Sequence, residues 1–167
     1  MPQKDFQSEN CSIARALGVL GDTWTLMIIR QAFLGTRRFA DFQSGLGISK
    51  NVLANRLQHL LDQDILEKTD AGTHGPRFEY QLTARGKDLT TIFTALRQWG
   101  DRWIFGDGNE PMLVVDRVTG RPVERLRIRR ADGTPVPTRD LSLQPGPGAS
   151  AETLRLFEQR RTEKTSQ

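Results

Sequence analysis

The sequence has little cysteine and no long apolar run, and both absences narrow what the protein can be. Among 167 residues Cys11 is the one cysteine, which excludes an internal disulfide and any metal site built on several cysteines. The longest apolar runs, Leu26–Ile29 and Met112–Val115, are far shorter than the roughly 20 residues of a membrane-spanning helix. The first ten residues are polar and lack the apolar stretch of a secretory signal. We therefore expect a cytoplasmic protein with no membrane association.

Basic and acidic residues nearly balance over the whole chain, but they are unevenly distributed along it. The 24 Lys and Arg against 20 Asp and Glu give a net charge of +4, which alone does not indicate a partner. Between Arg37 and Arg56, however, four basic side chains accompany only one acid, Asp41. A basic patch of this kind can bind nucleic acid, because the counterions released from phosphates supply affinity. Hydrophobic residues at 37% exclude wholesale disorder.

Apolar residues recur at helical spacing almost to residue 105, with one interruption by two strands. Ser49 follows a tight glycine turn and is the expected N-cap of a helix whose outer face is polar. A long later helix carries a narrow apolar seam that ends at Trp99 and Trp103, a pattern typical of helix pairing. The predicted helices are 11–19, 23–34, 38–44, 50–62 and 84–104, and the predicted strands are 65–69 and 77–82.

The pattern changes at Gly106, after which short strands and turns are predicted. Strands are expected at 112–115, 123–130 and 141–143, with a hairpin turn at Asp132-Gly133. A Pro-Gly linker precedes a last helix at 151–164. The predicted organisation is a flexible N-terminal arm (1–10), a main domain (11–105), a β-hairpin-rich extension (106–148) and a C-terminal helix and tail (149–167).

Three helices, a capped helix with a polar outer face and a two-stranded hairpin, in this order, indicate a winged helix-turn-helix. The expected fold class is therefore α+β, mainly α, with a long dimerisation helix and a small β-rich C-terminal extension. A helix such as 50–62 fits the DNA major groove, where its first turns reach base edges. Asn51, Asn55 and Gln58 can pair with adenine, and Val52 can contact a thymine methyl group. Arg56 can reach guanine or phosphate.

The hairpin loop offers further contacts, because His74 and Arg77 can enter the minor groove or lie along its phosphates. No nucleophile elbow, P-loop, dinucleotide fingerprint or paired metal ligands occur, so we expect no catalytic residue, metal or cofactor. The alternative function is a winged-helix protein-interaction module without sequence-specific DNA binding. The complete predicted set of DNA-binding residues is Arg37, Arg38, Ser49, Lys50, Asn51, Val52, Asn55, Arg56, His74 and Arg77.

Several motifs carry a family resemblance. They include Gly21-Asp22-Thr23-Trp24-Thr25-Leu26, Arg38-Phe39-Ala40-Asp41-Phe42 and Phe78-Glu79-Tyr80-Gln81-Leu82-Thr83-Ala84-Arg85-Gly86. On these stretches, residues 11–105 resemble the HxlR-type winged-helix transcriptional regulators, which are related to the MarR group. The resemblance implies a homodimer, paired through its terminal helices, that binds a pseudo-palindromic operator in double-stranded DNA as a repressor.

Two hypotheses remain open for the signal that such a regulator would answer. The resemblance implies that Cys11, near the first helix, could sense electrophiles or oxidants, whereas a lone cysteine is more often a small buried apolar residue. Alternatively, a small-molecule effector could enter a cleft lined by Trp24, Phe93 and Trp99, although aromatics at helical spacing are more often core or dimer contacts. Some relatives carry a zinc-ribbon-like module after the winged helix, but this chain has no cysteine there.

Overall fold

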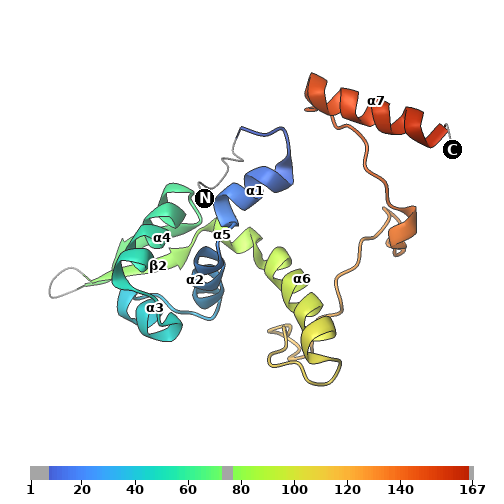
Figure 1. Ribbon diagram of the computed structural model, residues 1–167. Helices are drawn as coiled ribbons and strands as arrows, with labels where there is room; N and C mark the ends of the chain where they lie inside the picture. Colours follow the sequence, from blue (N-terminus) through green and yellow to red (C-terminus); the bar gives the residue numbers. More distant parts are fainter. Residues whose placement is uncertain (1–7, 73–76, 166–167) are drawn as a thin grey trace. The chain divides into compact units, whose positions relative to one another are not determined.

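The computed structural model describes residues 8–72 and 77–165 (Figure 1). These residues form two compact units. One unit is Leu20–Leu126, and the other combines the described parts of Met1–Val19 and Arg127–Gln167. Helix α1 (Ser12–Leu20) runs across the division. No single helix in the described ranges has the length and apolar composition to cross a membrane, and the bent pair α1 and α2 meets that test only when the two are combined.

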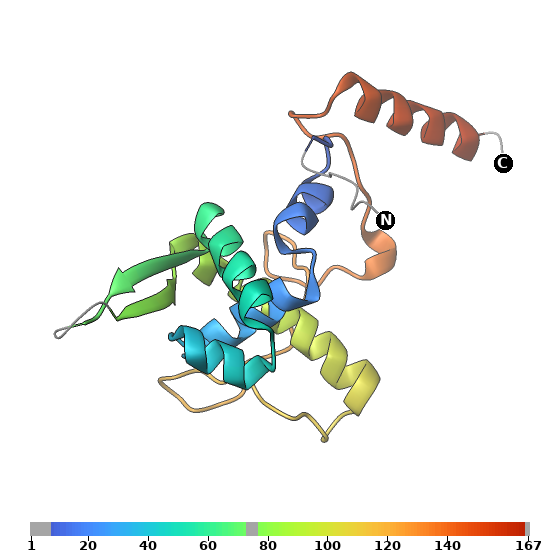
Figure 2. The same ribbon diagram turned by 60° about the vertical axis from the view of Figure 1, so that its left-hand side comes forward.

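Helix α2 (Thr23–Phe33) is the centre of the larger unit. It packs against α3 (Phe39–Leu46), α4 (Lys50–Asp62) and β2 (Phe78–Leu82), an arrangement visible in both ribbon views (Figures 1 and 2). Apolar side chains from these helices and from residues 65–66 at the start of the hairpin pack closely in a core that excludes water. Its fully buried members are Ile28, Ile29, Phe42, Leu53, Leu57, Leu60, Ile65 and Leu66.

The two strands form an antiparallel hairpin, which confirms the predicted fold class of a mainly helical protein with a small sheet. Strand β1 (Leu66–Asp70) pairs with β2 so that Leu66 lies opposite Leu82 and Asp70 opposite Phe78. The amide of Tyr80 also donates a hydrogen bond to the carbonyl of Arg37 (2.8 Å). Because Arg37 lies in the link between α2 and α3, this bond attaches the hairpin to the helices.

The predicted single helix 84–104 is wrong in one respect, because the structure divides it. It consists of α5 (Ala84–Asp88), α6 (Thr90–Gly100) and a π-helical turn, Asp101–Phe105. Helix α5 is held against the hairpin, since Thr83 caps it and also donates a hydrogen bond to the carbonyl of Asp64 (2.7 Å). The interruption falls at Leu89, between α5 and α6. Because leucine does not break helices and fits the apolar spacing, the sequence does not reveal the interruption.

The predicted strands 112–115, 123–130 and 141–143 are also wrong. Within the described part of the extension only two isolated bridges form, Val115 with Pro122 and Arg129 with Pro135. Each bridge includes a proline, which has no N–H group for a strand ladder. The side chain of Gln98 replaces a neighbouring strand at one point: it donates to the carbonyl of Glu124 (3.1 Å) and accepts from the amide of Leu126 (2.8 Å).

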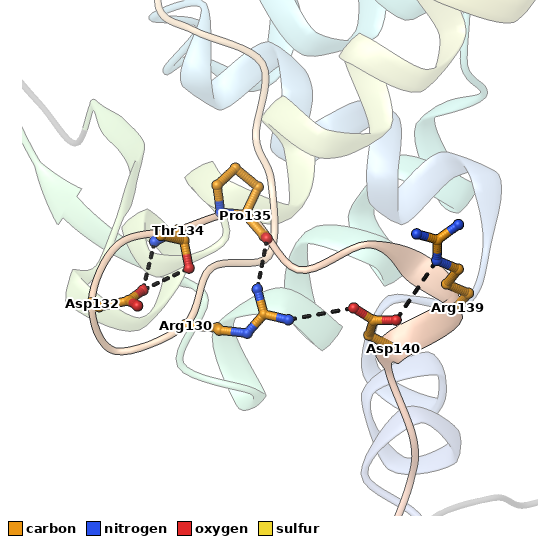
Figure 3. Close-up of polar contacts among 6 residues, drawn as sticks. All are labelled: Arg130, Asp132, Thr134, Pro135, Arg139 and Asp140. Carbon is orange, nitrogen blue, oxygen red and sulfur yellow. Dashed lines mark hydrogen bonds and ion pairs between the residues drawn. The ribbon is translucent and has the colours of Figure 1, made fainter.

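In the smaller unit, the expected turn at Asp132-Gly133 is present (Figure 3). Both the amide and the hydroxyl of Thr134 donate to Asp132 Oδ1 (2.8 and 2.7 Å), and these bonds hold the pKa of Asp132 below its ordinary value. Arg130 donates to the carbonyl of Pro135 and pairs with Asp140. These contacts order a segment that has no regular secondary structure of its own.

Helix α7 (Ala151–Thr165) begins after Ser150, whose hydroxyl accepts a hydrogen bond from the amide of Thr153 (3.1 Å). Asn10 supports the same helix start: its side chain accepts from the amide of Ser150 (2.9 Å) and donates to the carbonyl of Gly148 (3.1 Å). Asn10 belongs to the segment predicted as a flexible arm, so sequence patterning missed this contact between the two ends of the chain.

Candidate nucleic-acid interface

The turn between α3 and α4 sets the direction of α4. Gly47 ends α3 in the left-handed conformation (φ 62°), which glycine adopts without steric cost. Ile48 is buried, and the hydroxyl of Ser49 then accepts a hydrogen bond from the amide of Val52 (3.4 Å). Ser49 is therefore the N-cap of α4, as the sequence predicted, and its hydroxyl is used within the helix.

One face of α4 is exposed and polar, while the opposite face lies in the core. Lys50, Asn51, Asn55 and Gln58 are exposed, and Val52 is half-buried at the edge of this surface. Gln58 donates a hydrogen bond to Asp62 one turn later (2.8 Å). The first two turns of α4 thus present a lysine and two amides but no acid, which suits approach to a phosphate-lined groove.

Arg56 does not share this outward orientation. Its Nε atom lies 3.2 Å from Oδ1 of Asp22, the N-cap of α2, and the guanidinium is half-buried. The atoms are close enough for an ion pair, although Nε is not aligned for a hydrogen bond. The structure therefore connects Arg56 with the α2 cap, whereas the sequence offered it as a DNA contact.

Two arginines and a glutamate lie where the hairpin meets the link between α2 and α3. Arg37 and Arg38 are both exposed. Arg38 Nε lies 3.5 Å from Glu79 Oε1 on β2. The side chain of Arg38 is 59% exposed and that of Glu79 only 19%, so the guanidinium remains accessible to a phosphate while its carboxylate partner is half-buried.

The hairpin and its loop form the predicted wing. Asp70, at the end of β1, accepts hydrogen bonds from the amides of Arg77 and Gly72 (2.9 Å each). These bonds favour the charged form, so the pKa of Asp70 lies below its ordinary value. The ammonium of Lys68 lies 3.8 Å from the centre of the Phe78 ring. Arg77 is exposed, whereas His74 lies outside the described residues.

The predicted effector cleft is only partly assembled. Phe93 packs against Phe33 with ring centres 5.4 Å apart and lines two adjoining hollows between α2 and α6. Trp24 and Trp99 are exposed and are not among the side chains that line these hollows. Sequence reasoning did not identify the arginines that do line them, because those residues come from distant parts of the chain.

Cys11 is exposed and lies at the start of α1. It lines a cavity of about 350 Å³ together with Arg15 of the same helix and Phe157 of α7. The sequence pointed to Cys11 as a candidate sensor, but it did not reveal that α7 lies beside this cysteine. In the described ranges, no three His, Cys, Asp or Glu side chains are grouped closely enough to hold a metal ion.

Comparison with known proteins identifies the family. The sequence profile of the HxlR-like helix-turn-helix family matches residues 19–107. An uncharacterized HTH-type transcriptional regulator of Mycobacterium tuberculosis, Rv3095, is 33% identical over 147 residues, which cover 88% of this chain and 92% of the relative.

Solved structures agree with this result. The crystal structure of PA1607, a candidate transcription factor, is 36% identical with a TM-score of 0.78, and the match covers 86% of this chain and all of that one. The reduced form of the transcriptional regulator YodB from Bacillus subtilis is 28% identical with a TM-score of 0.51, over 57% of this chain and 96% of YodB. With the geometry of α3, α4 and the hairpin, these matches show that the chain belongs to the HxlR-like helix-turn-helix family of DNA-binding transcriptional regulators.

Proposed function

We propose that this regulator is a homodimeric, cytoplasmic repressor that binds a pseudo-palindromic operator. The observation that carries the proposal is the presence, in one compact unit, of two unpartnered surfaces of opposite character. Helix α4 has an exposed polar face with no acid in its first two turns, and α6 with the following π-helical turn has an exposed apolar face. The first surface suits a DNA groove, and the second suits another protein surface.

The apolar face supports pairing with a second copy of the chain. Trp99 and Trp103 are 58% and 65% exposed, and Ile92 and Leu96 on the same element are also exposed. A contiguous apolar surface of this kind marks a protein contact rather than a solvent-facing helix. A two-fold pairing is self-complementary and would present two α4 helices to DNA. Half-sites one helical turn apart, roughly 34 Å, follow from that symmetry.

We assign different tasks to the residues of the interface. Asn51, Val52 and Asn55 read bases in the major groove, because they lie on the exposed first turns of α4. Arg37, Arg38, Lys50 and Arg77 hold phosphates. Ser49 contributes by capping the first turn of α4. Arg56, which is paired with Asp22, positions α4 rather than contacting DNA.

The proposed repressor releases DNA in response to a small ligand or a thiol-reactive compound. Exposure of Cys11 supports the second signal, since an exposed thiol can be reached by such a compound. The hollow between α2 and α6 supports the first.

Footprinting on DNA that flanks the protein's own gene tests this proposal. We expect one protected, two-fold-symmetric site that competes at least 1000-fold better than random duplex, with affinity that falls steeply as salt rises (roughly this ratio or more is typical of specific binding). Light scattering should give the mass of a dimer. If no fragment is preferred, or if the binding partner is a protein held in a salt-independent way, the interaction-module alternative replaces the repressor.

A further inference from the structure

A hollow between α2 and α6 brings three arginines together. Arg30 comes from the last turn of α2, Arg97 from α6, and Arg117 from the turn that follows residue 115. The hollow has a volume of about 370 Å³, and no acidic side chain lines it. Three cationic groups therefore share one concave site that contains no opposite charge.

These three arginines differ from Arg56, Arg125 and Arg130 in having no carboxylate partner in the described part of their unit. Arg56, Arg125 and Arg130 each pair with an aspartate. In contrast, none of the three arginines of the hollow forms an ion pair with a described residue of the larger unit, 20–72 and 77–126. Asp101, one turn after Arg97, lines the adjoining hollow, which Arg30 and Arg97 also line, but it does not line the hollow that contains Arg117. Arg30 and Arg97 are half-buried, so their mutual repulsion is screened less than on an open surface.

The remaining walls of the hollow are apolar. Phe33 and Phe93 pack at a tilt of 55°, and Leu113 of the extension also lines the hollow. The two threonines of this region donate their hydroxyls to backbone carbonyls: Thr94 to that of Thr90 within α6 (2.8 Å), and Thr90 to that of Lys87 in α5 (2.6 Å). Polar recognition of a ligand therefore falls to the guanidinium groups.

We propose that this hollow binds a small organic anion, a carboxylate on an aromatic or branched aliphatic body. Guanidinium groups match the geometry of a carboxylate with two parallel hydrogen bonds, and the phenyl rings supply the apolar contact. The volume lies within the range of small-molecule sites, roughly 300–1,000 Å³. The single negative charge of the bound anion also reduces the repulsion among the three cations.

A ligand here would bridge two helices with different tasks. Helix α2 packs against α4, whereas α6 carries the exposed apolar face. An anion held by both Arg30 and Arg97 favours one spacing of α2 and α6, and through α2 it biases the position of α4. This consequence for DNA rests on the proposed function, but binding of the anion itself does not.

The test uses the full-length protein without DNA. Benzoate, phenylacetate and isovalerate are titrated by calorimetry up to roughly 10 mM, enough to saturate most sites even at a Kd of about 1 mM. Benzamide is the neutral control for shape. The variants are Arg30→Gln and Arg97→Gln, with Arg85→Gln as the matched control, because Arg85 is an exposed arginine of α5 outside the hollow.

We expect at least one carboxylate to bind at one site per chain, and benzamide not to bind. Affinity should fall about tenfold or more in Arg30→Gln and Arg97→Gln, the loss typical of one charge-assisted hydrogen bond, and should stay unchanged in Arg85→Gln. Thermal unfolding of each free variant shows that the chain is folded. Absence of binding by all three carboxylates, equal binding of benzamide, or unchanged affinity in both hollow variants overturns the proposal. None of these outcomes bears on operator binding, which is measured separately.

Discussion

Arg56 of α4 is paired with Asp22, the residue that caps α2, with 3.2 Å between Arg56 Nε and Asp22 Oδ1. The same carboxylate accepts hydrogen bonds from the amide of Thr25 (3.0 Å) and from its hydroxyl. Thr25 is fully buried. One aspartate therefore caps the central helix and also contacts the helix proposed to read DNA.

Replacement of Asp22 should separate the cap from the ion pair. We expect Asp22→Ala to lower the free energy of unfolding by about 1 kcal/mol through the lost cap, and by less than about 1 kcal/mol through the ion pair. The second contribution is small because the side chain of Arg56 is 39% exposed. Asp22→Asn keeps an acceptor and should retain most of the stability. Urea unfolding at one fixed protein concentration measures both variants, and equal losses would contradict the capping role.

Gly86 should not tolerate a side chain. A Cβ atom there would lie 2.2 Å from the carbonyl oxygen of Ile65 and 2.9 Å from a methyl group of Leu82. Because the first of these neighbours is backbone, Gly86→Ala must displace α5 from the hairpin, at a cost of about 1–3 kcal/mol. Gly146→Ala is the matched control, since no atom lies within 4 Å of its Cβ position. Thermal unfolding of the two variants should differ clearly, and similar melting temperatures would contradict the close approach of α5.

Substitutions on α4 should distinguish base contacts from phosphate contacts. We expect Asn55→Ala to weaken operator binding by about 1–3 kcal/mol and to relax preference at one base pair. Lys50→Ala, from the same exposed surface, should weaken binding to all sequences alike and reduce the salt slope by about one ion. Binding to a library of single-base operator variants at several salt concentrations measures both effects. Unchanged specificity in Asn55→Ala would overturn the assignment of α4.

The wing should respond to pH through Asp70. Its folded pKa lies below the ordinary value of 3.8, first because of the amide of Arg77 and then because of that of Gly72. The charged carboxylate therefore stabilises the wing at pH values above its unfolded pKa, and this contribution is lost as pH falls through the folded pKa. In an NMR titration, the amide signals of Gly72 and Arg77 should move together at an apparent pKa below 3.8. In Asp70→Asn this step should disappear, and its persistence would assign it to another group.

A thiol switch at Cys11 predicts a specific pattern of oxidation. With one cysteine per chain, an oxidised state must be an adduct or a bond between two chains. Diamide should lower operator affinity of the wild type at least tenfold and leave Cys11→Ser unchanged, as gel shifts can show. If both proteins lose DNA equally, or if neither does, the thiol switch is wrong and the arginine hollow becomes the better explanation of release.

Helices and strands that are specified by caps, turns and apolar spacing within a few residues of one another could be predicted from the sequence. Helix α4 begins and ends as expected because its cap, Ser49, and its apolar spacing are both local. The two strands of the wing match their expected bounds to within one residue at each end for the same reason. Helical spacing also assigns Asn51 and Asn55 to the polar face of α4, and both side chains are exposed there.

The sequence by itself thus determined the family, the order of the helices and strands from α2 to β2 and the exposed face of α4. The tertiary structure decided where long side chains go and which distant segments meet. It directs Arg56 to Asp22, holds α5 against the carbonyl of Ile65, and replaces the expected strands of the extension with isolated bridges. It also brings Arg30, Arg97 and Arg117 into one hollow. The physical reason is that caps, turns and helical periods depend on neighbours along the chain, whereas ion pairs and cavities depend on how separate elements pack.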